Sequence, residues 1–188
     1  MIARAPHAIA LETADYIVRT LETGDASEAF REWLADPDTA RMLNAPTRHL
    51  SAKAVRDYIA SFDRVKAHLL GIFEKATGRL VGIRAVYINW PQREFLVNVL
   101  IGEKDARNKG ARTQSRTAVY RHFFETLDLD LARATVLADN AAVLGGMPKR
   151  GWIEDGRDAR PQAEGTGFVE VVRFRLPRDV WRKRMGLA

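Results

Sequence analysis

The sequence predicts an α/β domain with a mixed, mostly antiparallel central sheet and helices on both faces. Two observations support this fold class. Apolar residues first recur at helical spacing and then change to strand-like runs. Strand and helix signals then alternate from Phe95 onward, which is typical of helices packed on a sheet. Because 188 residues match one ordinary domain, we expect a single domain over residues 1–188.

Two amphipathic helices are predicted in the first third of the chain. Asp25 stands three residues before Glu28, which is the spacing of a capping box, so we expect a helix to begin after Asp25. Ser51 is the predicted cap of the second helix. Pro37 and Pro46 bracket the segment between the helices, which we therefore predict as a connection.

The predicted strands rest on short apolar runs bounded by turn residues. A turn at Lys75–Gly78 joins Leu69–Glu74 to Leu80–Ile88, which predicts a hairpin. Phe95–Ile101 is apolar almost throughout, as expected of a central strand covered on both faces. Further strands are predicted at Tyr16–Thr20, Ala134–Ala138 and Phe168–Leu176.

The second half of the chain contains the elements that we expect around a ligand. A long helix should follow Gly110 and end near Leu127, and Asn140 should begin a weaker helix. Arg157–Gly165 is polar and is predicted as a loop. Phe95–Ile101 and Ala134–Ala138 each end at a candidate ligand loop, so we expect these two strands to diverge at their carboxyl ends.

Composition excludes several classes of protein. The chain has no cysteine, which excludes disulfide scaffolds, thiolate metal sites and cysteine nucleophiles. Its four histidines show no ligand spacing, so no metal site is predicted. No apolar run approaches the ~20 residues of a membrane helix. His7 and Glu12 interrupt the apolar stretch of Met1–Val18, which makes it a poor secretory leader. We therefore expect a cytoplasmic enzyme or binding domain without membrane contact.

The charge pattern points to an anionic ligand. The net charge is +6, from 30 Lys and Arg against 24 Asp and Glu. Between Lys104 and Arg121, six basic residues stand against one acidic residue, a local excess of five. Tyr120, Phe123 and Phe124 are the aromatic residues of this region, and their spacing favours the core, which argues against a nucleic-acid surface.

The loop between the strand at Phe95–Ile101 and the long helix has the chemistry of a pyrophosphate cradle. The first N–H groups of a helix lack intrahelical partners and carry partial positive charge. A glycine lets the backbone approach an anion closely, and neighbouring Lys and Arg add charge-assisted hydrogen bonds. The sequence contains neither GxxxxGK[ST] nor GxGxxG, so the usual nucleotide motifs are absent. The predicted cradle consists of Arg107, Asn108, Lys109, Gly110, Ala111 and Arg112.

These residues resemble a known family. Arg107 to Gly110 is similar to the [Q/R]-x-x-G-x-[G/A] motif of the GNAT (general N-acetyltransferase) superfamily. Asn140 and Lys149–Trp152 resemble the N…K-x-G-[F/W] segment of that family. Val180–Arg182 resembles the branch that acetylates the N-terminal alanine of ribosomal proteins. The resemblance extends roughly from residue 16 to residue 184.

The resemblance implies acetyl-CoA, or a related acyl-CoA, as co-substrate, without a metal. It implies direct transfer in a ternary complex to a primary amine. A protein N-terminus is our first choice of acceptor, and the alternatives are a small-molecule amine acceptor and a non-catalytic acyl-CoA-binding or interaction module. A homodimer is left open. The residues expected to bind the acyl-CoA are the cradle, Asn140, and the backbone of Val99, Leu100 and Ile101.

The resemblance transfers less well to the acid and base. Arg112 stands where the motif usually has Gly or Ala. Met147, Val143 and Thr135 stand where family members often have Tyr, Ser and Glu. The candidates that remain are Glu94, as a base acting through water, and Asn98, a polar residue within the apolar strand. Asn98 would either face the substrate or be a buried amide with its hydrogen bonds satisfied.

Overall fold

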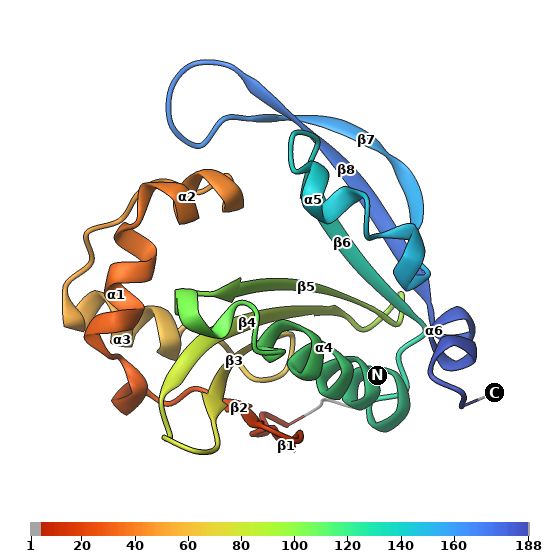
Figure 1. The fold of residues 1–188 in the computed structure, drawn as a ribbon, viewed down its shortest axis with the longest axis horizontal. Helices are drawn as coiled ribbons and strands as arrows, with labels where there is room; N and C mark the ends of the chain where they lie inside the picture. The colour runs from red at the N-terminus through yellow and green to blue at the C-terminus, as the bar shows by residue number, and fades with distance from the viewer. Residues whose placement is uncertain (1–4, 188) are drawn as a thin grey trace.

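In a computed structural model, which describes residues 5–187, the chain forms an eight-stranded sheet in the order β1-β2-β3-β4-β5-β6-β8-β7 (Figure 1). All neighbouring strands are antiparallel except β5 and β6, which are parallel. The predicted fold class is therefore confirmed. The strands are β1 (Ala10–Glu12), β2 (Tyr16–Thr20), β3 (Ala67–Glu74), β4 (Leu80–Asn89), β5 (Glu94–Ile101), β6 (Leu131–Leu137), β7 (Ile153–Pro161) and β8 (Phe168–Pro177).

Helices cover both faces of this sheet, as predicted (Figure 1). One face carries α1 and α3, whose Phe30, Trp33 and Ile59 pack against β3, β4 and β5. The opposite face carries α4, whose Val119 and Tyr120 pack with residues of β5 and β6. The helices are α1 (Glu28–Ala35), α2 (Pro37–Leu43), α3 (Ala52–Ala60), α4 (Ala111–Arg121), α5 (Ala141–Leu144) and α6 (Arg178–Arg184), and α4 continues as a π-helical turn at His122–Thr126.

The end of β5 is held tightly against α1. Gly102 follows β5, and a β-carbon there would lie 2.0 Å from the Trp33 ring, so only glycine fits. The Trp33 indole N–H donates to Glu103 at 3.1 Å. The chain therefore leaves β5 in a fixed direction, toward a short 3₁₀ turn at Lys104–Ala106 and then α4.

Several boundaries differ from the prediction. The cap of α1 is Ser27, whose hydroxyl accepts from the Phe30 N–H, and Asp25 belongs to the preceding 3₁₀ turn. The segment after Pro37 is the helix α2, because proline is compatible with a first helical position and Asp36 caps it. Residues 157–161, predicted as part of a loop, belong to the edge strand β7.

Residues 1–4, part of the segment considered as a leader, lie outside the described residues. Within residues 5–187, no helix has the length and apolar character that a membrane crossing requires.

Candidate active site

Strands β5 and β6 separate after a short paired stretch, as predicted (Figure 1). Their parallel pairing ends at Leu96 and Arg133. β5 continues beside β4 as far as Ile101, and β6 continues beside β8 as far as Leu137. The facing edges of the last residues of β5 and β6 therefore present backbone N–H and C=O groups that the sheet does not use. This divergence is suited to holding an extended, amide-containing ligand.

The three predicted backbone ligands lie in the last part of β5, beyond its pairing with β6. Val99, Leu100 and Ile101 pair with β4 on one side only. Their side chains pack against helices: Val99 and Ile101 face α4, and Leu100 faces α1 and α3. A ligand in the divergence would therefore meet backbone rather than side chains here, although the Ile101 carbonyl already accepts from Arg107. The expected role of these three residues stays a prediction.

The cradle loop leads directly from β5 into α4. Gly110 is the residue before α4 and has a φ of 87°, a left-handed conformation that favours glycine. No side chain caps α4, whereas α1, α2 and α3 are capped by Ser27, Asp36 and Ser51. The first N–H groups of α4 are therefore available to an anion.

Some of the other cradle residues hold the loop in place through hydrogen bonds, and others are exposed. Arg107 donates from Nε to the Ile101 carbonyl at 3.2 Å, which ties the loop to the end of β5. The Lys109 carbonyl accepts from the Tyr16 hydroxyl at 3.0 Å, which ties the loop to β2. Ala111 is buried, whereas Asn108 and Arg112 are exposed. The loop is thus held to β5 and β2 by hydrogen bonds, and Asn108 and Arg112 remain exposed to solvent.

An arginine cluster surrounds the start of α4. It comprises Arg84 of β4, Arg107, Arg112 and Arg116 of α4, and Arg150 of a short 3₁₀ turn. Among residues 5–187, none of the five forms an ion pair with a carboxylate. Desolvation, followed by the charges of neighbouring arginines, lowers the pKa of both Arg112 and Arg116. Positive charges held together without carboxylates form a site for a polyanion.

Asn140 lies at the other wall of the divergence. Its side-chain oxygen accepts from the Val143 N–H at 3.2 Å and caps the short helix α5. Met147, in the place of the frequent family tyrosine, is 4% exposed and belongs to the core. Its sulfur lies 3.4 Å from Nη2 of Arg150. Val143 and Thr135 are half-buried and apolar or uncharged.

The two predicted catalytic residues lie on the opposite face of β5, toward α1 and α3. Glu94 accepts from Nε of Arg133 at 2.6 Å, and Arg133 also donates to Asp155 at 2.7 Å. Asn98 is exposed and stands opposite Ala85 of β4, beside Tyr87. The catalytic roles of Glu94 and Asn98 remain predictions.

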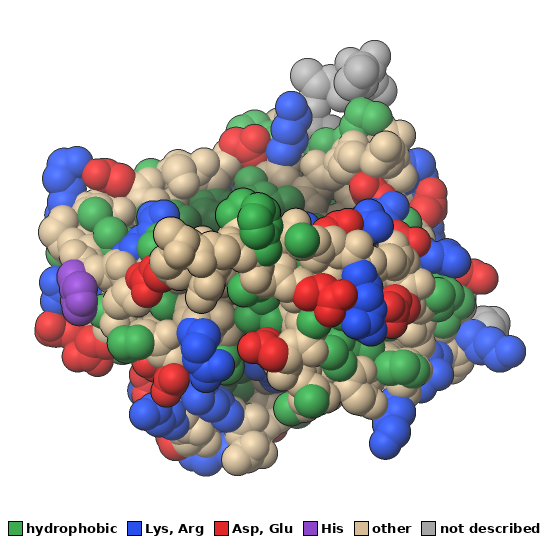
Figure 2. All heavy atoms as spheres, turned by 90° about the horizontal axis from the view of Figure 1, so that it is seen from above, with side chains coloured by type: hydrophobic (Ala, Val, Ile, Leu, Met, Phe, Trp, Pro, Cys, Tyr) green, Lys and Arg blue, Asp and Glu red, His purple; other side chains and the backbone are tan. Residues whose placement is uncertain are grey.

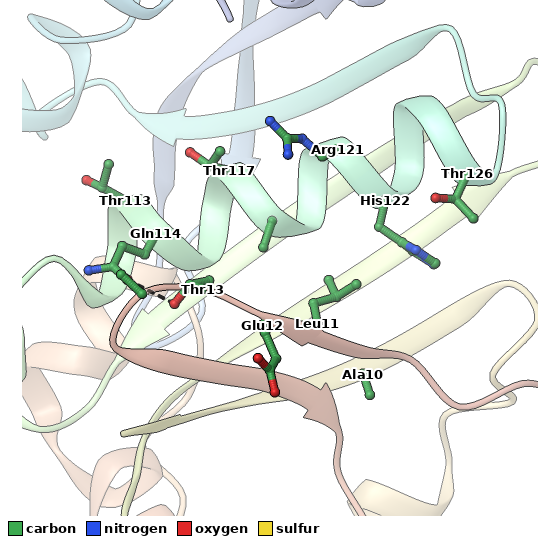
Figure 3. A pocket seen from close by; sticks show the side chains of 12 residues that line it. Ala10, Leu11, Glu12, Thr13, Thr113, Gln114, Thr117, Arg121, His122 and Thr126 are labelled. Atoms are coloured by element: carbon green, nitrogen blue, oxygen red, sulfur yellow. Dashed lines mark hydrogen bonds between the residues drawn. The ribbon is translucent and has the colours of Figure 1, made fainter. Parts of the chain in front are cut away.

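One hollow in the described residues lies away from these side chains. It has a volume of about 540 Å³ and lies between β1 and the outer side of α4 (Figure 3). Figure 3 shows Thr113, Thr117 and Arg121 of α4 along one wall, with Thr13 hydrogen-bonded to Gln114 near its end. It contains none of the predicted site residues. The candidate site is instead the divergence of β5 and β6, beside which the arginine cluster lies.

Three residues near the divergence were not predicted: Arg84, Arg116 and Arg150. Arg84 was detectable as a charge within the apolar run of β4. Arg116 follows Arg112 by four residues, which places both on one side of a helix. Arg150 lies within the Lys149–Trp152 segment that resembles the family motif, but that motif does not assign it a role in binding. Within the described residues, no group of histidine, aspartate and glutamate side chains is arranged to hold a metal ion.

Comparison with known proteins identifies the family of the chain. Residues 16–152 match the family model described as an acetyltransferase (GNAT) domain. Because the match spans most of the chain, the protein belongs to the GNAT acetyltransferase family and is an acetyl-CoA-dependent N-acetyltransferase. No curated protein sequence matches the chain.

Solved structures of low sequence identity share the fold. A ribosomal-protein-S5-alanine acetyltransferase from Vibrio fischeri has a TM-score of 0.76 at 13% identity, covering 92% of this chain and 98% of that one. A spermidine N-acetyltransferase from Vibrio cholerae, in complex with CoA and spermine, has a TM-score of 0.78 at 15% identity, covering 89% and 98%. A GNAT-family acetyltransferase from Bacillus anthracis has a TM-score of 0.76 at 16% identity, covering 91% and 99%.

Proposed function

We propose that this acetyltransferase binds acetyl-CoA with its pyrophosphate at the start of α4 and its pantetheine along the free edge of β5, and transfers the acetyl group to a protein N-terminus. The observation that carries the cofactor site is the uncapped start of α4 behind Gly110, within the arginine cluster. The N–H groups of the first turn would bind the phosphate oxygens, and Arg112 and Arg116 would neutralise charge.

The free edge of β5 supports the second part of this pose. Amides of the pantetheine arm would pair with the backbone of Val99–Ile101 as an added strand. The same edge offers N–H groups to the thioester oxygen, whose negative charge grows in the transition state. Because these groups belong to the backbone, stabilisation of the thioester oxygen would not depend on the side chains that family members usually have.

Tyr120 is the residue that we propose to protonate the leaving thiolate in place of the missing family tyrosine. Its ring is 5% exposed and packs on Phe95 of β5 and on Trp152, which follows Met147 and Arg150. Among the described residues, its hydroxyl has no hydrogen-bond partner. Burial raises the pKa of Tyr120, which keeps its proton in place at neutral pH. The nearby charges of Arg84, Arg116 and Arg150 lower that pKa and would favour the phenolate after donation.

The acceptor would enter on the face of α1 and α3, where carboxylates are already paired. Glu94 and Asp155 bind Arg133, and Asp158 binds Arg173 at 3.0 Å. A polyamine is recognised by free carboxylates, and this face offers few of them. The pairing therefore favours an acceptor with one amine over a polycation.

A peptide-sized acceptor also fits the rim of this face. Asn44, after α2, donates to the Pro161 carbonyl at 3.1 Å and accepts from the Ala163 N–H at 2.9 Å. These bonds clasp the β7–β8 connection to α2. Met42, Leu43 and Phe168, next to the clasp, are exposed apolar side chains, with Phe168 74% exposed. Exposed apolar groups beside an active site support a peptide over a small hydrophilic amine.

An acetyl-transfer assay against a panel of acceptors tests this function. The panel contains peptides with N-terminal alanine or serine, the same peptides with blocked N-termini, spermidine and single amino acids. We expect transfer to free peptide N-termini and none to blocked ones. Preferential transfer to spermidine, or acetyl-CoA binding without transfer to any peptide, would contradict the acceptor proposal.

A further inference from the structure

Arg84 is a cation enclosed beneath the first turns of α4. It lies in the middle of β4, and only 2% of its surface is exposed. Its Nε donates to the Ser115 hydroxyl at 3.0 Å, and its Nη2 donates to the Arg112 carbonyl at 2.7 Å. Both acceptors belong to α4, so the guanidinium of Arg84 is bound to the backbone and hydroxyl groups behind the cradle.

No negative charge balances Arg84 within the described residues. It forms no ion pair, and the charged groups that face it are the cations Arg112 and Arg116, together with the neutral hydroxyl of Tyr120. The positive end of the α4 dipole adds to the same field. Burial, more than the neighbouring charges, lowers the pKa of Arg84 to about 9. A buried charge without a partner destabilises a fold, and an apolar side chain of similar length would fill the space at lower cost.

We propose that Arg84 is a positioning residue of the acyl-CoA site, an internal cation that costs stability in the free protein and is compensated when the pyrophosphate binds. This inference rests on the proposed cradle at Gly110–Arg112. Through Arg112 and Ser115, Arg84 fixes the first turn of α4 from behind, so that its free N–H groups face outward. It also adds a positive charge to the site from a direction that solvent does not screen.

The proposal predicts opposite signs for free stability and for binding. Arg84→Met removes the charge and keeps the length of the side chain. Without ligand, its melting temperature should be equal to or higher than that of the unmodified protein. Its Kd for CoA should rise about tenfold, because one weakly screened charge is lost at the phosphate site. KM for acetyl-CoA should rise while kcat at saturation is kept, and acetyl-pantetheine, which lacks the pyrophosphate, should be used as before.

Two further variants make the test specific. Arg84→Lys keeps the charge and loses the planar fork, so it should recover part of the CoA affinity. Arg93→Met is the matched control, because Arg93 is paired with Asp128 and Asp130 away from the cradle. It should lower the melting temperature slightly and leave the Kd for CoA unchanged.

The outcomes separate this proposal from the proposed function. A destabilised or unfolded Arg84→Met protein would show that Arg84 is only structural and would overturn the proposal, as would an unchanged Kd for CoA. If Gly110→Asp abolishes CoA binding while Arg84→Met binds normally, the cradle is supported and the proposed role of Arg84 is contradicted. If Gly110→Asp itself binds CoA normally, the cradle and the role of Arg84 fall together.

Discussion

Arginines in two regions of the molecule differ in whether a carboxylate pairs with them. Around the start of α4, Arg84, Arg112 and Arg116 have no carboxylate partner within residues 5–187. On the face of α1 and α3, Arg133 and Arg173 each bind a carboxylate. Residue type alone therefore does not mark a binding site. A cluster of arginines that lacks carboxylates and includes a buried member points to an external anion, whereas a paired arginine belongs to the structure.

The surface in Figure 2 illustrates the paired arrangement. Seen from above, blue basic and red acidic side chains are interspersed, and hydrophobic side chains form small separate groups. A mixed surface of this kind creates little long-range field, because opposite charges cancel within a screening length. The net charge of +6 is thus less informative than the local imbalance beside the cradle.

The largest expected effect comes from placing a negative charge in the cradle. Gly110→Asp puts a carboxylate beside the diphosphate, and repulsion of ~4 kcal/mol at 4 Å and an effective dielectric of 20 shifts a micromolar Kd toward millimolar. Because Gly110 has a φ of 87°, any side chain there also costs backbone energy. Gly110→Asn has the same shape without the charge and is the control. Isothermal titration with acetyl-CoA should show much weaker binding for the Asp variant than for the Asn variant. Equal binding would contradict the claim that the loop at Gly110 binds the pyrophosphate.

A second prediction contrasts Arg84 with the buried base His68, which is fully buried near His7 and His122. Burial is the main cause that lowers the pKa of His68 to about 4, from 6.5 when unfolded. Between pH 6.5 and pH 4, His68 is protonated in the unfolded chain but neutral in the folded protein. The free energy of unfolding therefore decreases as pH falls through this range. The loss is about 3 kcal/mol. Urea unfolding at pH 7 and pH 4.5 measures it, and His68→Leu should lose less stability on acidification; an equal loss would place the acid sensitivity elsewhere.

The third prediction concerns the proton that leaves with the thiolate. Tyr120→Phe keeps the ring between Phe95 and Trp152 and removes the hydroxyl. We expect kcat to fall about 100-fold, with the Kd for CoA unchanged and the alkaline limb of the pH–rate profile displaced. Steady-state kinetics from pH 6 to pH 10 provide the measurement. If kcat and the profile are unchanged, Tyr120 is only a core residue.

A fourth prediction sharpens the role of Arg112, which replaces the small residue of the motif. Arg112→Gln should weaken CoA and dephospho-CoA alike, by roughly 1.5–3 kcal/mol, if the side chain serves the pyrophosphate. Weakening of CoA alone would move Arg112 to the ribose 3′-phosphate. Unchanged titration of both ligands would remove Arg112 from the binding cluster.

The smallest effect is expected on the paired face. Arg173 and Asp158 form a half-exposed pair at 3.0 Å. Arg173→Gln should change the free energy of unfolding by no more than ~0.5 kcal/mol and leave acetyl-CoA binding intact. Chemical denaturation and titration check both statements. A large loss of acetyl-CoA affinity would mean that pairing does not separate structural arginines from binding ones.

The sequence could predict the parts of the site that depend on local pattern. The cradle was predictable because a buried strand, Gly110 and a helix follow one another. The divergence of β5 and β6 was predictable because both strands are apolar and end at polar loops. The edge strand β7 was missed, because an edge strand exposed on both faces keeps charged residues and shows no apolar alternation.

Charge balance could not be predicted, because it depends on contacts between distant segments. Arg84 and Arg133 both lie within strands and are equivalent in sequence. The fold brings Glu94 and Asp155 to Arg133, and only a hydroxyl and a carbonyl to Arg84. For the same reason, the ion pair of Glu94 with Arg133 could not be predicted from the sequence.

The most direct test of the account is a crystal structure of the protein with CoA bound. The account predicts pyrophosphate oxygens within hydrogen-bond distance of the backbone N–H groups that follow Gly110. It also predicts the pantetheine arm along the β5 edge at Val99–Ile101, between β5 and β6. CoA bound elsewhere, such as in the hollow between β1 and α4, or a pyrophosphate without contact to the start of α4, would contradict the central claim that the unpaired arginines mark the acyl-CoA site.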